Sequence, residues 1–176
     1  MKFLKVQFLD GIIFSVNDFF SKLGDENIEN MGVSTTTHSI KIRDTAVWIG
    51  FAGTFFQGYL LHVYDDDLIK HLSNLFSKSY GLQINTKELI DSVLMETANI
   101  VMSKTNKSYG DSNFRVTIPR ILDAHKYEIK GDTQQPLTKI EFLLSKMQYR
   151  IILLIKEGGR PLYNERVLNS ITLESF

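Results

Sequence analysis

The sequence predicts an α+β fold in which helices pack on a largely antiparallel sheet. Three segments carry apolar residues at helical spacing, and several others are rich in β-branched and aromatic residues. The strand segments follow one another through short connections, as in β-hairpins. Helices and strands do not alternate as they do in parallel βαβ folds, so an antiparallel sheet is expected.

The first helix is predicted over residues 10–23, where Ile12, Val16 and Phe19 share one face, and Gly24 ends it. The polar stretch 25–37 is predicted to be a loop that leads into a strand. Alternation over residues 39–43 predicts that strand.

Residues 46–52 and 58–64 are rich in β-branched and aromatic residues and predict a hairpin. The connection Gly53–Gly58 has the glycine spacing of a phosphate loop, but Tyr59 stands where that motif has lysine. We therefore interpret it as a hairpin turn. Phe55 and Phe56 at its tip either complete the core or offer an exposed contact to a partner.

A second helix is predicted from the run Asp65–Asp67 to about Lys78, because acidic residues complement the positive end of the helix dipole. A third follows over residues 87–104. Asn85 is its predicted N-cap, with Glu88 as the capping-box partner.

The rest of the chain returns to strands, and Gly158, Gly159 and Pro161 end the regular pattern. We predict one domain over residues 1–176, with a core at about 8–157 and a C-terminal tail at 158–176. The four predicted strands cover residues 114–118, 126–130, 138–144 and 149–156.

Composition limits the kinds of function. The 176 residues include 20 basic and 20 acidic side chains, and no basic patch predicts a nucleic-acid partner. Cysteine is absent, which excludes disulfides, thiolate metal sites and cysteine nucleophiles. Neither a signal peptide nor a membrane-spanning run is predicted, so a cytoplasmic protein is expected.

The third predicted helix carries a narrow polar stripe formed by Ser92, Glu96, Asn99 and Ser103, at spacings of four, three and four. A fully buried helix has no reason to align its polar groups, and an ordinary surface helix has a broader polar face. The stripe therefore suggests a surface that meets another protein. A simple solvated stripe remains the alternative. Apolar side chains border it on both flanks: Val93, Met95, Ile100 and Met102.

The acid and the amide also suit a particular reaction. A carboxylate can pair with a partner's lysine, and a side-chain amide offers both a donor and an acceptor. Such an amide can hold a water in line with a phosphoryl group, and phosphoryl transfer depends mainly on positioning. We predict no metal ligands, because His38, His62, His71 and His125 lack metal-binding spacing.

With these residues the chain resembles the CheC/CheX/FliY family of chemotaxis phosphatases, and CheX most closely. The family carries Asp or Ser, then Glu four residues on, Asn three residues later and often Gly after four more. Here Ser92, Glu96 and Asn99 match, and Ser103 replaces the glycine. The resemblance covers about residues 8–157. It includes Val47–Gly53 with Gly58–Leu61, Phe114–Pro119, and the closing hairpin at Lys139–Phe142 and Tyr149–Ile155.

The resemblance implies a CheX-like fold and a phosphatase that hydrolyses the phospho-aspartate of a CheY-like response regulator in two-component chemotaxis signalling. Glu96 would dock on the regulator's lysine, and Asn99 would orient the attacking water. Ser92, Met95, Ile100 and Ser103 would contact the partner, with Met102 on the same rim. The chain would bind no cofactor itself, since Mg²⁺ belongs to the regulator.

Some family members carry the motif twice. In this chain the first helix has Asp10 and Asn17 in register, but Phe14 stands where the acid would be. One active site per chain is therefore expected, with Phe14 buried in the core. The resemblance also implies a homodimer formed through strands, for which the closing hairpin is the candidate.

Two other functions stay open. A non-catalytic adaptor of the same fold would bind a regulator or a flagellar switch component without hydrolysing the phosphate. A purely structural dimerisation domain would need neither Glu96 nor Asn99.

Overall fold

The computed structural model describes residues 2–24, 28–122, 127–131 and 136–157. The tail after Gly158 lies outside them, as does the predicted boundary between the core and this tail. In chain order, the elements are α1 (Lys2–Lys22), β1 (Ile28–Thr36), β2 (Ile40–Ile42), β3 (Thr45–Ala52), β4 (Phe56–Tyr64), α2 (Asp66–Tyr80), α3 (Lys87–Tyr109), β5 (Arg115–Val116), β6 (Arg120–Leu122), β7 (Tyr127–Ile129), β8 (Leu137–Leu144) and β9 (Met147–Glu157).

The main sheet has the strand order β1-β8-β9-β4-β3, with β5 and β6 both pairing on the outer side of β3. All of its described pairings are antiparallel, and so is the small separate ribbon of β2 and β7. The predicted α+β class with a largely antiparallel sheet is therefore confirmed.

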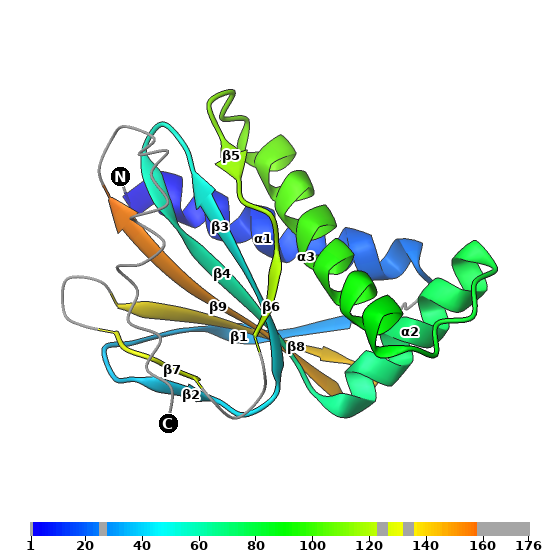
Figure 1. The fold of residues 1–176 in the computed structure, drawn as a ribbon. Helices are drawn as coiled ribbons and strands as arrows, with labels where there is room; N and C mark the ends of the chain where they lie inside the picture. Colours follow the sequence, from blue (N-terminus) through cyan, green and yellow to red (C-terminus); the bar gives the residue numbers. More distant parts are fainter. Residues whose placement is uncertain (1, 25–27, 123–126, 132–135, 158–176) are drawn as a thin grey trace.

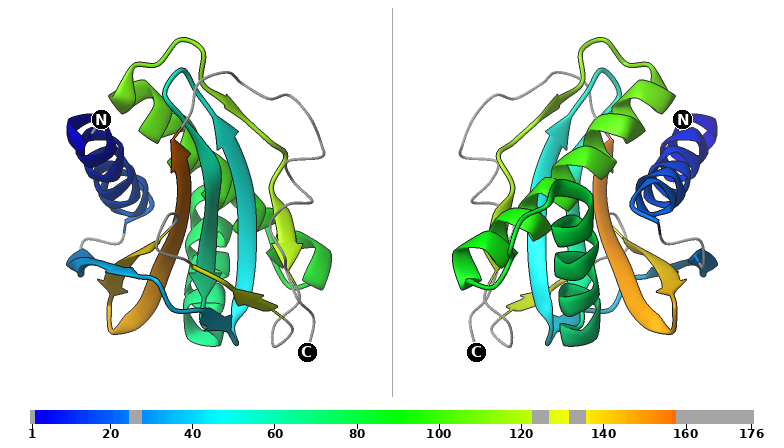
Figure 2. Two further views of the ribbon diagram at one scale, coloured as in Figure 1. Left: turned by 90° about the vertical axis from the view of Figure 1, so that its left-hand side faces the viewer. Right: turned by 90° about the vertical axis from the view of Figure 1, so that its right-hand side faces the viewer.

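Helices α1 and α3 lie side by side on one face of the sheet, and α2 packs beside α3 near one end (Figures 1 and 2). The main core fills the space between these helices and the sheet. Phe8, Ile12 and Val16 of α1 meet Leu94 and Ala98 of α3 in this core, together with alternate residues of the strands.

The opposite face of the sheet carries a second apolar cluster around Trp48, Leu61 and Ile152. Ile42 of β2 and Ile129 of β7 cover it. Because both faces of the sheet centre are covered, the inner residues of β3 and β4 are buried almost without interruption. This burial explains why the two segments are continuous apolar runs in the sequence.

The predicted central hairpin is confirmed, since β3 and β4 pair antiparallel along their length. A side chain at Gly58 would place its Cβ 2.0 Å from the Leu154 carbonyl oxygen of β9, so this glycine allows close packing of two strands. At the tip, Phe55 is exposed and Phe56 is buried, so only Phe55 remains available to a partner.

The prediction of a loop over residues 25–37 was wrong for most of the segment. Residues 28–36 form β1, which pairs with β8 along its length and has a bulge between Asn30 and Gly32. Almost every side chain of β1 is exposed. An edge strand open to solvent on both faces needs no alternation of apolar residues, so its sequence pattern resembles that of a loop.

The closing hairpin of β8 and β9 is confirmed, and its two-residue turn places Ser145 and Lys146 at positive φ, as in a type I′ turn. Its role as a dimer edge was wrong. β8 is paired to β1 and β9 is paired to β4, so neither strand has a free side. Of the predicted strand 114–118, only Arg115–Val116 forms a strand, β5, and β6 begins after Pro119, beyond the predicted range.

Helix α1 starts well before the predicted residue 10, at Lys2. The polar Lys5, Gln7 and Asp10 interrupt the apolar run, but the buried Phe8 continues the helical face one turn earlier. No helix in the described part of the chain is long and apolar enough to span a bilayer.

Candidate functional site

Helix α3 presents the polar stripe and is capped at both ends. Thr86, and not the predicted Asn85, is the N-cap, since its hydroxyl accepts a hydrogen bond from the Leu89 backbone N–H at 3.4 Å. At the other end, Gly110 adopts a left-handed conformation with φ 76° and donates its N–H to the Asn106 carbonyl. The helix therefore has definite ends that fix its length and register.

The buried side of α3 fixes which side chains reach solvent. Leu94, Ala98 and Val101 are buried against the sheet. Thr97 and Thr105 are also buried, and each returns its hydroxyl to the carbonyl four residues earlier at 2.8 Å. On the sheet side, the Tyr64 hydroxyl of β4 donates to the Leu94 carbonyl at 3.4 Å. The stripe is thus mounted on a helix whose inner face is packed and hydrogen-bonded.

The stripe lies on the surface as predicted: Ser92, Glu96, Asn99 and Ser103 are all exposed. The Ser92 hydroxyl donates to the Glu88 carbonyl at 2.8 Å, so its donor is already used within the helix. Within the described residues, Glu96 and Asn99 have no hydrogen-bond or ion-pair partner. Their polar groups are free to meet another molecule.

The flanks of the stripe differ from the prediction at two residues, because Val93 is buried as well as Met102. Met95 and Ile100 are half-buried, so both remain able to contact a partner. Met102 is fully buried in the core and cannot belong to the contact rim. At 100° per residue, Met102 lies about 100° round the helix from Ser103, toward the side that packs on the sheet.

The stripe is also longer than predicted. Glu88 and Lys107 lie four residues beyond its two ends, and both are exposed. The same four-residue spacing that defines the stripe is present at both positions in the sequence, so one further turn at each end could have been included. The exposed Leu89 adds an apolar group beside the first turn.

Helix α1 supports α3 through a close contact built from small residues. The hydroxyl oxygens of Thr105 and Ser15 lie 3.2 Å apart, and Ser15 donates to the Gly11 carbonyl at 2.6 Å. A Cβ at Gly11 would lie 3.5 Å from Thr105 Cγ2, so the two helices approach closely here.

An ion-pair cluster extends this contact. Asp18 accepts Lys104 Nζ from α3 at 2.6 Å and Lys22 Nζ from its own helix at 2.8 Å. Hydrogen bonds from Lys104 and Lys22 hold the pKa of the Asp18 carboxyl below its ordinary value, and the bond from Lys104 has the larger effect.

The register match on α1 gave one wrong expectation. Phe14 is not buried: 60% of its surface is exposed, and Asp10 and Asn17 are exposed with it. The side of α1 that packs contains Ile12, Val16 and other residues, while Phe14 points away from them. The helix does serve packing, but through a different face.

Metal binding has no geometric support in the described ranges, where no three His, Asp or Glu side chains are grouped to hold an ion. His62 is buried beside the Tyr149 hydroxyl, and burial lowers its pKa to about 3, so it is neutral. Asp65 caps α2, as expected for the acidic run, by accepting from the Leu68 N–H at 2.7 Å.

The fold is shared with solved structures of chemotaxis proteins. A CheC-like protein from Shewanella oneidensis matches with a TM-score of 0.68 at 15% identity, covering 86% of this chain and 99% of that one. CheX from Vibrio vulnificus matches with a TM-score of 0.69 at 14% identity, covering 85% and 99%. CheX of Borrelia burgdorferi was solved in a complex with CheY, BeF₃ and Mg²⁺. It matches with a TM-score of 0.59 at 19% identity, covering 86% of this chain and 96% of that one.

These likenesses define the class of fold, that of CheC-like and CheX chemotaxis proteins. The family model for the chemotaxis phosphatase CheX matches residues 45–143, which is more than half of the chain. The chain therefore belongs to the CheX family of chemotaxis phosphatases. A comparison of the sequence with curated proteins gives no match.

Proposed function

We propose that this chain removes the phosphoryl group from the phospho-aspartate of a CheY-like response regulator, with Glu96 and Asn99 as the residues that act. One observation carries the assignment of residues. Glu96 and Asn99 are exposed, lie one turn apart and have no partner among the described residues, on a helix whose other side is packed. Membership in the CheX family supports the reaction, and the Borrelia complex of CheX with CheY supports the choice of partner.

The division of labour follows from the chemistry of the two side chains. The Glu96 carboxylate docks on a lysine of the regulator, which draws that lysine away from its other contacts. The Asn99 amide enters the phosphorylated site and orients a water for in-line attack, since it can donate and accept at once. The regulator carries Mg²⁺, so this chain contributes positioning and no metal.

A packed helix suits this role because positioning requires little residual motion. Thr97 and Ala98, the two residues between Glu96 and Asn99, are both buried, and Thr97 is hydrogen-bonded within the helix. A side chain that is displaced by about 1 Å can lose roughly 10²-fold in rate. Ser103, in place of the family glycine, adds only a small exposed hydroxyl and is compatible with close approach.

The decisive experiment measures phosphate release from a phosphorylated CheY-like regulator with and without the protein. Acceleration that depends on Asn99 supports the phosphatase. Binding of the regulator without acceleration would favour the non-catalytic adaptor instead. The cytoplasmic location expected from the sequence remains part of this proposal.

A homodimer formed through strands also remains a proposal, and its supporting feature is now β1 instead of the closing hairpin. β1 is paired on one side only within the described sheet, and Met31 and Val33 are exposed on it. An unpaired strand edge can add a strand from a second copy. Sedimentation of the parent and of Val33→Lys tests this: the parent should be dimeric and the variant shifted toward monomer, and two monomeric proteins would contradict it.

A further inference from the structure

We propose that a pocket between the three helices, beside the Glu96–Asn99 stripe, receives an acidic side chain of the response regulator and sets which regulator the protein accepts. This inference rests on the proposed function, because it names how the same partner is recognised. It concerns residues outside the stripe itself.

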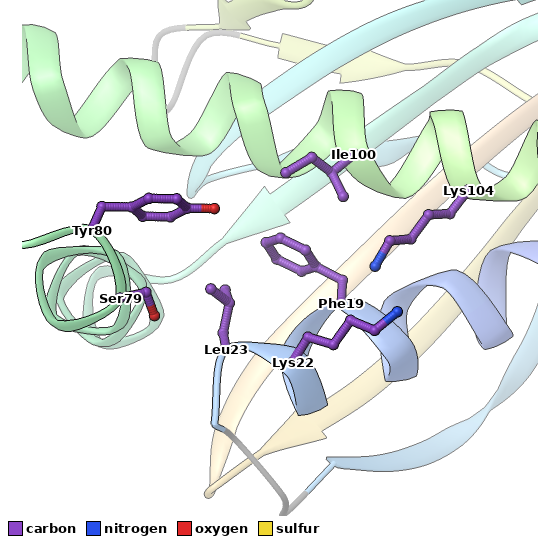
Figure 3. Close-up of a pocket in the computed structure, with 7 residues that line it drawn as sticks. All are labelled: Phe19, Lys22, Leu23, Ser79, Tyr80, Ile100 and Lys104. Atoms are coloured by element: carbon purple, nitrogen blue, oxygen red, sulfur yellow. The ribbon is translucent and has the colours of Figure 1, made fainter.

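The pocket has a volume of about 320 Å³ and opens where the ends of α1 and α2 meet the middle of α3 (Figure 3). Its walls are mostly apolar, formed by Phe19 and Leu23 of α1 and Ile100 of α3. Tyr80 at the end of α2 is largely exposed and forms part of the rim. In Figure 3, Lys22 and Lys104 extend into the same space from α1 and α3.

The pocket adjoins the stripe because the two share one helix surface. Ile100 directly follows Asn99, and Lys104 directly follows Ser103. Each lies about 100° round the helix from its stripe neighbour, on the side that faces α1. A partner protein that covers the stripe will therefore also cover the mouth of the pocket.

The charges in the pocket favour an acidic group. Lys22 and Lys104 both pair with Asp18, at 2.8 and 2.6 Å. Two ammonium groups share one carboxylate, so this cluster keeps a net positive charge of one. The Lys104 ammonium also lies 5.9 Å from the centre of the Phe19 ring, which holds it over the apolar wall.

This positive site lies beside a negative one. Glu96, Ile100 and Lys104 are spaced four residues apart, so the acid and the lysine are two turns apart on neighbouring lines of α3. A partner with a basic group for Glu96 and an acidic group for the pocket fits in one orientation only. Charge complementarity of this kind governs the choice of partner and the association rate more than the chemical step.

The occupant is therefore an acidic side chain of the regulator with an apolar neighbour. The carboxylate would meet the lysines, and the neighbour would pack on Phe19, Leu23 and Ile100. A regulator that lacks this acid would still offer its phospho-aspartate, but would bind more weakly. The pocket thus selects among regulators, while Asn99 acts on whichever one is bound.

The test uses the full chain with a phosphorylated regulator and measures KM and kcat separately. Lys22→Glu should raise KM about fivefold with kcat unchanged, since reversing one rim charge removes a modest attraction. Lys22→Arg keeps the positive charge and should therefore keep the parental KM. Asp18→Asn should lower KM, because the cluster then carries two positive charges. All of these differences should shrink as salt concentration rises.

Lys22→Glu should raise KM and Asp18→Asn should lower it, and these opposite changes in KM distinguish a recognition role from structural damage. A variant that merely loosened α1 from α3 would lower kcat, and its thermal unfolding would reveal this. Lys41→Glu is the matched control, because Lys41 is exposed on β2, across the sheet from the helices. It should leave KM unchanged.

Asn99→Ala in the same assay distinguishes failure of the pocket inference from failure of the proposed function. If Asn99→Ala abolishes turnover while Lys22→Glu and Asp18→Asn keep the parental KM, the pocket inference alone is overturned. If the parent protein does not accelerate phosphate release at all, the proposed function fails, and the pocket inference fails with it.

Discussion

Helices α1 and α3 pack against each other on the same sheet, and each carries a line of residues in the same register on its exposed side. On α3 the line reads Ser92, Glu96 and Asn99; on α1 it reads Asp10, Phe14 and Asn17. Both lines reach solvent, so exposure alone does not separate them. The family pattern accepts either Ser or Asp at the first position, so the difference that matters is at the second, where α3 has the carboxylate of Glu96 and α1 has the aromatic ring of Phe14.

This comparison suggests that the two helices share a scaffold but not a function. The proposed reaction needs an acid to dock the partner and an amide to orient a water, and α1 retains only the amide. Phe14 is exposed at the position where the acid would stand.

The largest expected effect contrasts two phenylalanines on α1. Phe8 is fully buried among Phe51, Phe56 and Phe114, whereas most of Phe14 is in water. Phe8→Ala should lower the free energy of unfolding by about 3–5 kcal/mol, and Phe14→Ala by less than about 1 kcal/mol. Chemical denaturation at several protein concentrations measures both. Equal losses would mean that Phe14 is covered in solution.

The second effect contrasts the two asparagines. Asn99→Ala should reduce kcat by about 10²–10³-fold, since a positioned group that acts in the transition state contributes on this scale. Asn17→Ala should leave turnover at the parental rate. Phosphate release measured for the two variants side by side decides it, and a loss of turnover in Asn17→Ala would reveal a second site on α1.

A smaller effect is expected at Glu96. Glu96→Gln should weaken regulator binding about tenfold and lower the rate, because it keeps the shape of the side chain but loses the ion pair with the partner's lysine. Binding by the parent should fall with rising salt, and binding by the variant should depend on salt less. An affinity that is flat in salt for both proteins would argue against the lysine contact.

The smallest effect concerns pH and the contact between the helices. The pKa of Asp18 is lowered in the folded protein by Lys104 and Lys22. Its contribution to stability is therefore present above the unfolded pKa, near 4, and is lost as pH falls through the lower folded value. Thermal unfolding between pH 6 and 3 should decline more steeply for the parent than for Asp18→Asn. Parallel curves would show that the ion pairs add nothing.

Elements could be predicted from the sequence where their local apolar pattern agrees with their burial in the fold. The hairpin of β3 and β4, helix α2 and helix α3 all combine strong apolar patterns with clear turns or caps. The exposed stripe on α3 was predictable because helical periodicity places Glu96 and Asn99 opposite the buried Leu94 and Ala98.

Other features depend on tertiary contacts that no local pattern encodes. β1 carries exposed side chains on both faces and was mistaken for a loop. Asn85 and Thr86 are adjacent and equally suitable N-caps, so the choice between them depended on where the chain enters the helix. Phe14 was expected in the core because a helix without the acid was expected to serve packing alone. The pocket could not be predicted, since it joins three helices that are distant in sequence.

The pairing of β1 with β8 has a consequence for how the protein is made. Ile28–Thr36 must wait for Leu137–Leu144, about a hundred residues later, before it can join the sheet. At a synthesis rate of ~5–20 residues per second, that interval lasts roughly 5–20 s. During this time the nascent chain exposes an unpaired segment with Met31 and Val33 on its surface. Folding should therefore finish late and slowly, as is usual where sheet contacts span long sequence distances.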